Sequence, residues 1–292
     1  MTWLLFALLA ALSESFKSLF SKQSLQAVSP QWTALAACSI PIPLLLGWLL
    51  VTHAIPSLGP KFLWALLIGG SLNVWALFLF MRALQASDLS VTVPFISFTP
   101  IFLLVTSPVL VGDKPTALDI LGILCIVTGA YTLHIRLAHQ DIWAPFRAIL
   151  QQEGPRKMLG VALIYSVSSN FDKIGVQQSS PLVWSLSLTS VMTLGFLLLM
   201  RWTSPPSSSF PWQPRPLALL VLIGLFQGIG LLVHNHALSI GPVPSVIAVK
   251  RSSILFAAIW GCMFLGERQI QERLGGALLM VLGMGIMAWG QG

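Results

Sequence analysis

Apolar runs of about twenty residues, each ended by a short polar break, recur along the whole chain. A helix needs about 20 predominantly apolar residues to cross a lipid bilayer. Ten windows reach this length, and Gly, Pro, Ser and Asp punctuate the breaks between them. They predict an all-α integral membrane protein with ten transmembrane helices, at 2–22, 31–52, 61–84, 90–111, 116–136, 157–177, 182–201, 216–239, 243–265 and 270–290.

The composition argues against a soluble protein. Hydrophobic residues make up 55% of the 292 residues and charged residues only 9%, whereas soluble domains carry about 25% charged residues. The net charge is +7, but the basic residues are spread over short connections, as topology signals are, and do not cluster on one nucleic-acid-binding face. We expect a multi-pass protein of the cell (inner) membrane, with the lipid bilayer as a partner and no nucleic acid.

The chain contains an internal repeat. Ser21-Lys22 matches Asp172-Lys173 at an offset of 151, and Gly112-Asp113-Lys114 matches Gly266-Glu267-Arg268 at an offset of 154. Each half holds five predicted spans, an odd number, so the second half must enter the membrane from the opposite side. Inverted repeats of this kind are typical of secondary transporters. The repeat predicts a five-helix half at 1–137, a connecting segment at 138–156 with an apolar stripe suited to the membrane surface, and a second five-helix half at 157–292.

Two Gly-acid-base motifs close the fourth span of each half, at Gly112-Asp113-Lys114 and Gly266-Glu267-Arg268. Asp172-Lys173 ends the sixth span, and glycines seven residues apart, at Gly122 and Gly129 and at Gly276 and Gly283, predict that spans five and ten pack closely. With these motifs the chain resembles the EamA-type members of the drug/metabolite transporter superfamily. The resemblance implies a ten-helix transporter of small organic solutes. It does not indicate the substrate, because the family handles amino acids, sugars, drugs and other metabolites.

Lys250 and Arg251 stand side by side within the ninth window. A cation near the centre of a spanning helix costs roughly 2.5–3.5 kcal/mol and usually faces a polar pathway. The repeat equivalents, Ile96 and Ser97, carry no charge. We therefore predict that Lys250 or Arg251 binds an anionic group of a substrate. Adjacent helical residues point about 100° apart, so which of the two faces the substrate stays open, as does a structural pairing with Asp172, Glu14 or backbone.

Glu14 lies near the middle of the first span, with Lys17 three residues later on the same helical face. Glu14 is a candidate for substrate binding and for proton coupling. The region around it also resembles the first helix of the small multidrug-resistance branch, which implies an alternative, a cation/drug–proton antiporter centred on Glu14. A third possibility is that Glu14 only neutralises Lys17.

Further polar residues lie inside the predicted spans. The predicted topology brings Asp172, Lys173, His234, Lys250 and Arg251 into one half of the membrane. Asp172, Lys173 and Lys17 are expected to form supporting ion pairs, and His234, Asn73 and Gln227 are candidates for substrate binding. His234 and His236 lie about 200° apart around a helix, which excludes joint metal chelation there. We expect neither a metal nor a cofactor.

The sequence contains neither a Gly-x-Ser-x-Gly nor a His-Glu-x-x-His motif, so nothing indicates an intramembrane enzyme. We predict a secondary active transporter of an anionic or zwitterionic metabolite that works by alternating access, with proton coupling through Glu14. The alternatives are the antiporter and a non-transporting membrane scaffold. A monomer is sufficient, because both halves lie in one chain, and a dimer is compatible. The charge bias predicts termini outside the cell, whereas the family resemblance implies cytoplasmic termini.

Overall fold

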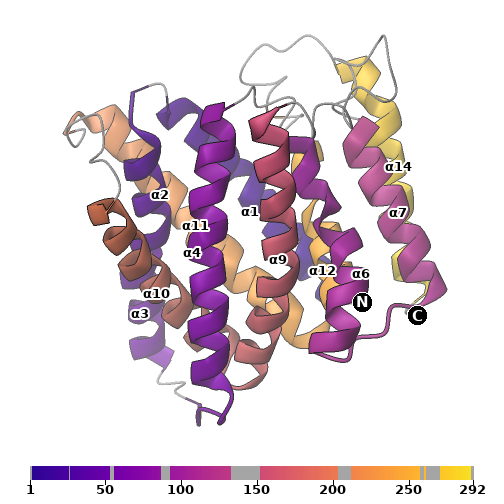
Figure 1. The fold of residues 1–292 in the computed structure, drawn as a ribbon, viewed down its shortest axis with the longest axis horizontal. Helices are drawn as coiled ribbons and strands as arrows, with labels where there is room; N and C mark the ends of the chain where they lie inside the picture. The colour runs from indigo at the N-terminus through magenta and orange to yellow at the C-terminus, as the bar shows by residue number, and fades with distance from the viewer. Residues whose placement is uncertain are drawn as a thin grey trace.

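The computed structural model describes residues 2–25, 27–52, 56–86, 93–132, 152–202, 212–256, 260 and 270–290. Within these ranges every element is a helix, and the helices lie side by side as one bundle (Figure 1). The first half contains α1 (Thr2–Ser24), α2 (Pro30–Ser39), α3 (Pro41–Thr52), α4 (Phe62–Ala86), the 3₁₀ helix η1 (Val93–Phe98), α6 (Thr99–Leu110) and α7 (Ala117–Thr132). The second half contains α9 (Glu153–Gln177), α10 (Pro181–Trp202), α11 (Pro214–Ile240), α12 (Val243–Lys250) and α14 (Ile270–Trp289).

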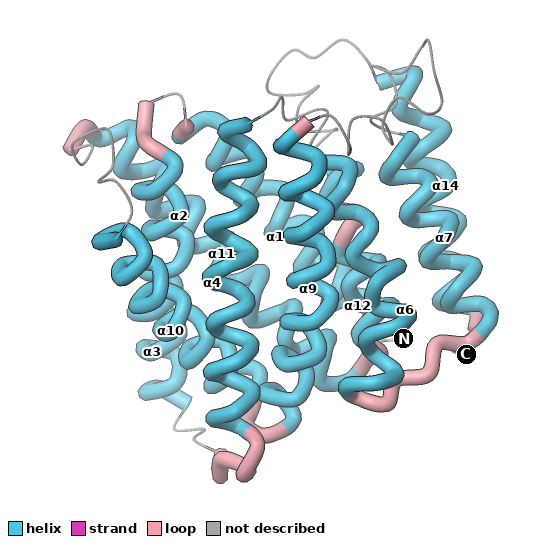
Figure 2. The backbone as a smooth tube through the Cα atoms, in the orientation of Figure 1, coloured by secondary structure: helices cyan, strands magenta, loops and turns pink. Residues whose placement is uncertain are grey.

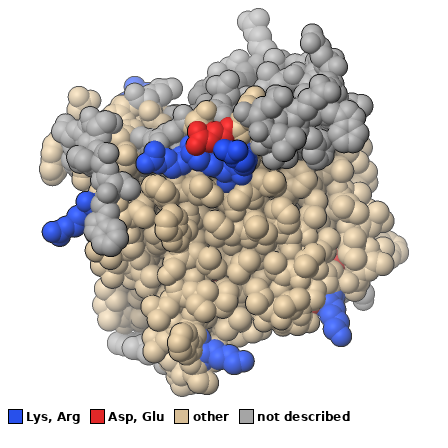
Figure 3. Space-filling model, in the orientation of Figure 1, with Lys and Arg blue, Asp and Glu red and all other residues tan. Residues whose placement is uncertain are grey.

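Each predicted window contains helix, and five helical stretches are long and apolar enough to cross a membrane by themselves. These are Thr2–Ser21, Gln31–Thr52, Phe62–Phe80, Pro181–Arg201 and Pro214–Ile240. The middle of the flank seen in Figure 3 shows no charged side chains, and the charged side chains visible there lie towards the two ends of the bundle. Large apolar residues such as Val51, Val109 and Leu198 are among the exposed ones. This distribution suits a lipid environment.

The two ends of the bundle differ in the connections that they carry. We call side A the end with the connections at 56–61, 112–116, 178–180 and 241–242, which lies at the bottom of Figure 2, and side B the opposite end. The largest buried cluster surrounds α12 and is formed by α1, α6, α7, α11, α12 and α14. From Val243 to Val249, α12 is completely buried. This core fills the side-A half of the bundle around α12.

Helices α7 and α14 pack at backbone distance, as their glycines predict. A Cβ atom placed on Gly129 would lie 2.6 Å from the carbonyl oxygen of Gly276, and one placed on Gly283 would lie 2.5 Å from that of Gly122. Both distances are shorter than any real Cβ contact, so only glycine fits there. The prediction that these four glycines allow close helix packing is confirmed.

Several sequence predictions fall outside the described residues. The Gly266-Glu267-Arg268 motif, most of the connection at 138–156 and the end of the ninth window belong to this group. The side chain of Lys22 also lies outside the described part.

Candidate functional site

Arg251 lies at a break in the ninth predicted span. Helix α12 ends at Lys250, a turn contains Arg251 and Ser252, and helix resumes from 253 to 256. The Arg251 amide donates to the carbonyls of both Ile247 and Ala248 at 3.1 Å, and the Ser252 amide donates to that of Val249 at 2.9 Å. The bonds to Ala248 and Val249 span three residues and are of the 3₁₀ type, whereas the bond to Ile247 keeps the α-helical spacing of four. The uninterrupted helix expected over 243–265 is therefore broken at the cationic pair.

The fourth span of the first half is irregular at the equivalent place. There the 3₁₀ helix η1 precedes α6. At the repeat offset of 154, Ser97 of η1 is the sequence equivalent of Arg251. Non-helical backbone at membrane depth is tolerated only where it is buried in protein or lines an aqueous space. In transporters, such breaks commonly surround the substrate site.

The guanidinium of Arg251 is held by an uncharged partner. Its Nη2 donates to Thr99 Oγ1 at 3.1 Å, and Thr99 Oγ1 in turn donates to the Ile96 carbonyl at 2.7 Å. The buried Nε atom of Arg251 has no hydrogen-bond partner. None of the ion pairs among the described residues involves Arg251. The Thr99 bond holds the side chain, and no carboxylate of the described residues forms an ion pair with its positive charge.

Lys250 is partly buried, and its side chain has neither a hydrogen bond nor an ion pair with another described residue. It lies in a field of other charges, since Glu14, Lys17, Arg251 and Asp172 all interact with it electrostatically. Residues of α1, α9 and the end of α12 therefore form one charged cluster, of which Asp172 is buried and the others are partly buried. We call Glu14, Lys17, Asp172, Lys250 and Arg251 the central charge cluster.

Glu14 and Lys17 form the expected ion pair within α1, three residues apart. Their side chains remain 29% and 22% exposed, respectively. Leu5, which is 64% exposed, lies nine residues before Glu14 and therefore about 180° around the helix. Glu14 is thus partly exposed on the face of α1 that lies opposite the exposed Leu5.

Asp172 and Lys173 have separate partners. Asp172 Oδ1 accepts a hydrogen bond from Trp184 Nε1 at 3.3 Å, whereas Lys173 forms an ion pair with Asp113, with Nζ–Oδ1 and Nζ–Oδ2 distances of 2.8 and 2.9 Å. Neighbouring residues on a helix point about 100° apart, so the two side chains reach different elements. The supporting ion pairs are therefore Glu14–Lys17 and Asp113–Lys173, and Asp172 belongs to neither.

His234 is buried on α11, and its Nδ1 atom has no hydrogen-bond partner in the described part of the chain. The charges of Lys250 and Arg251 act on it, so it borders the central charge cluster. His236 instead packs its ring edge-on against Phe6, with centroids 4.3 Å apart. The two histidines thus face different surroundings, and the described residues contain no group of His, Cys, Asp and Glu suited to a metal ion.

The contacts of the two mid-span amides, Asn73 and Gln227, do not by themselves indicate substrate binding. Asn73 Nδ2 donates to the carbonyl of Gly69 at 2.9 Å, within its own helix α4. Gln227 is partly buried on α11. Neither forms a hydrogen bond with the central charge cluster among the described contacts, so their role in substrate binding stays a prediction.

Three further polar residues were not among the sequence candidates. Tyr165 interacts electrostatically with Glu14 and Arg251, and it is the repeat equivalent of Glu14 at the offset of 151. Asn170 Nδ2 donates to Thr106 Oγ1 at 3.2 Å, while the buried Asn170 Oδ1 has no partner. Asp113 could have been found from its motif. Tyr165 could have been found by applying the repeat offset to Glu14.

These features define a multi-pass helical membrane protein with a partly buried charged cluster near an interrupted helix. A model of the EamA-like transporter family matches residues 1–134 and 157–289. The chain belongs to this family, and with it to the drug/metabolite transporter superfamily. The search of curated proteins found no match. A solved structure titled "Crystal structure of protein" has a TM-score of 0.78 and 16% identity, covering 98% of this chain and 96% of that one, which shows a shared fold.

Proposed function

We propose that this protein is a secondary active transporter of a small organic metabolite with an anionic or zwitterionic group. The observation that carries the proposal is Arg251, a partly buried guanidinium that is held by the Thr99 hydroxyl and whose Nε has no hydrogen-bond partner among the described residues. Leaving a charge buried without an opposite charge is costly. A substrate carboxylate or phosphate would supply the missing charge, and the planar guanidinium matches such groups with two parallel hydrogen bonds.

The balance of charge within the central charge cluster also favours an anionic group. Glu14 is paired with Lys17, so Asp172 is the remaining acid against the two bases Lys250 and Arg251. One positive charge is left over when both acids are ionised. A zwitterion is accommodated as well, because the partly exposed carboxylate of Glu14 suits an ammonium group.

Alternating access between two inverted five-helix repeats is part of the proposal, and the packing supports it. Helix α1 packs along α11, and α4 packs along α9. In the repeat, α1 corresponds to α9 and α11 corresponds to α4. The contact between α1 and α11 is therefore equivalent to the contact between α9 and α4. The contact of α7 with α14 maps onto itself, and that of α6 with α9 maps onto that of α12 with α1. Two halves related in this way can rock around a site between them.

The first test uses Arg251→Ala beside Arg251→Lys. A thermal-shift screen of purified protein against carboxylates, phosphates and amino acids identifies a ligand, and uptake into proteoliposomes measures its transport. Loss of a charge-assisted hydrogen bond of about 1.5–3 kcal/mol predicts that Arg251→Ala weakens binding by about 10- to 100-fold. Arg251→Lys keeps the charge but loses the two-pronged geometry, so an intermediate affinity is expected.

Arg201→Ala is the matched control, because Arg201 is exposed at the end of α10 and its loss should leave binding unchanged. Wild-type transport kinetics in a folded Arg251→Ala, Lys250→Ala double variant would reject the proposal.

A cation/drug–proton antiporter centred on Glu14 is the second candidate. It is favoured by one observation, the 29% exposure of the Glu14 side chain on the inner face of α1. In that case a cationic substrate displaces a proton from Glu14, and protein in weakly buffered detergent releases protons when the substrate is added. Glu14→Gln should abolish the release. If an anionic ligand binds and Glu14→Gln leaves any proton release unchanged, the antiporter is excluded.

A further inference from the structure

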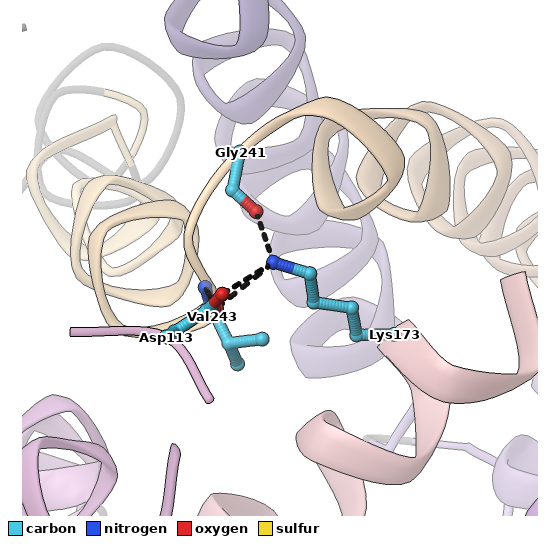
Figure 4. Close-up of polar contacts among 4 residues, drawn as sticks. All are labelled: Asp113, Lys173, Gly241 and Val243. Carbon is cyan, nitrogen blue, oxygen red and sulfur yellow. Dashed lines mark hydrogen bonds and ion pairs between the residues drawn. The ribbon is translucent and has the colours of Figure 1, made fainter. Parts of the chain in front are cut away.

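A polar network ties three segments together at side A (Figure 4). Lys173 Nζ, at the end of α9, contacts both carboxylate oxygens of Asp113 and also donates to the Gly241 carbonyl at 3.1 Å. Asp113 Oδ2 accepts a hydrogen bond from the Val243 amide at 2.8 Å. The network therefore joins the connection between α6 and α7, the end of α9, and the turn between α11 and α12.

The backbone turn at Gly112 places Asp113 in this network. Gly112 has a φ of +76°, a backbone conformation that glycine adopts without strain, and the reversal directs Asp113 towards α12. The carboxylate bonds to the first amide of α12, where the helix dipole favours negative charge. Lys173 is only 8% exposed, so its ion pair is shielded from solvent, and the Coulombic attraction between the two charges is stronger than in a surface pair.

Burial changes along α1 at the level of the central charge cluster. Trp3, Ala7, Ala10, Glu14 and Lys17 follow one another at spacings of three and four residues, and so form one stripe of α1. Its first three members, towards side A, are buried, whereas Glu14 and Lys17 are partly exposed. Ser18, on the same face towards side B, is exposed. The stripe is closed on side A and accessible towards side B.

We propose that the Asp113–Lys173 ion pair, with its bonds to Gly241 and Val243, is the latch that holds side A closed. This inference rests on the proposed alternating access. When side A opens, α9 and the start of α12 separate from the 112–116 connection, and the latch breaks. When side A closes, the latch forms again and the central charge cluster faces side B. The latch thus sets the equilibrium between the state with side A open and the state with side A closed, without contacting the substrate.

Two cysteine reporters on the stripe of α1 test the latch without any substrate. Cys38, Cys125 and Cys262 are first replaced by Ser, and then either Ala7→Cys or Ser18→Cys is introduced. The rate of reaction with a water-soluble maleimide is measured in proteoliposomes that present both faces. Lys173→Ala and Asp113→Asn should raise labelling at position 7 by about ten-fold, the scale expected for losing a charge-assisted hydrogen bond. Both changes should lower labelling at position 18.

The opposite direction of the two effects separates a latch from general loosening, which would raise labelling at both positions. Lys157→Ala is the matched control, since Lys157 forms an ion pair with Glu153 within the same helix α9 and should change neither rate. Lys173→Arg keeps the charge and the donors, and should restore most of the wild-type pattern.

A single variant can misfold because it leaves one charge buried without its partner. The double variant Asp113→Asn, Lys173→Met removes both charges, and it should fold and label like the single variants. Unchanged labelling in folded variants would reject the latch. Loss of folded protein in all three would reject it too, because a gating contact must be dispensable for the fold. Since no ligand is added, these results stand apart from whether Arg251 binds an anion.

Discussion

Thr99 is the residue that orients Arg251. Its hydroxyl accepts from Arg251 Nη2 and donates to the Ile96 carbonyl, so both of its hydrogen-bonding functions are used. Because Thr99 begins α6 and Arg251 follows α12, the bond also joins the irregular regions of the two halves. A polar but uncharged residue can hold the guanidinium in position without neutralising it. An acid at position 99 would compete with the anionic substrate that we propose for Arg251.

Thr99→Val tests this role. It keeps the shape of the side chain and removes the hydroxyl, with a loss of about 0.5–1.5 kcal/mol for a typical hydrogen bond. We expect roughly 2- to 12-fold weaker binding of an anionic ligand in the thermal-shift or proteoliposome assay. Thr128→Val is the control, because the Thr128 hydroxyl bonds to carbonyls of its own helix, α7. Unchanged affinity in a folded Thr99→Val protein would mean that Arg251 is oriented by other contacts.

At the scale of elements, the pair α7 and α14 serves as a rigid edge of the bundle. Its glycines bring the two backbones into direct contact, with a Cβ on Gly283 only 2.5 Å from the Gly122 carbonyl oxygen. Backbone cannot move aside as a flexible side chain can. A larger side chain at this contact would therefore have to push the two helices apart.

Gly283→Ala and Gly285→Ala form a matched pair of changes on α14. A Cβ on Gly285 meets nothing within 4 Å, so alanine there should be neutral or stabilise by up to about 1 kcal/mol through helix propensity. Gly283→Ala should destabilise by about 1–3 kcal/mol, as overpacking does. Thermal unfolding in detergent measures both. Equal unfolding temperatures for the two variants would contradict the close contact.

The length of the apolar runs was sufficient to locate helix in every predicted window, because about twenty consecutive apolar residues can cross a membrane in few conformations other than a helix. The Glu14–Lys17 ion pair was predictable too, since a spacing of three residues sets both on one helical face. The break at Arg251 and Ser252 was not, because no proline or glycine marks it. The Asp113–Lys173 pair joins residues 60 positions apart, and only tertiary packing determines such a contact.

At the scale of the whole molecule, the principal contacts cross between the halves. Helix α1 packs along α11, and α4 along α9. Each half therefore supplies the surface that covers the other, and the central charge cluster draws residues from α1, α9 and α12. The EamA-like transporter family model matches the chain in two segments, in keeping with this mutual dependence of two similar parts.

The Glu14–Lys17 ion pair also matters for how the protein is made. During synthesis α1 enters the lipid long before α11 and α12 leave the ribosome, and a lone charge there would carry a large insertion cost. An ion pair within a single helix needs no other part of the chain, so the two charges can offset each other from the first moment. The nascent helix can thus stay in the bilayer until the helices that pack against it are made, with the Glu14 carboxylate already paired.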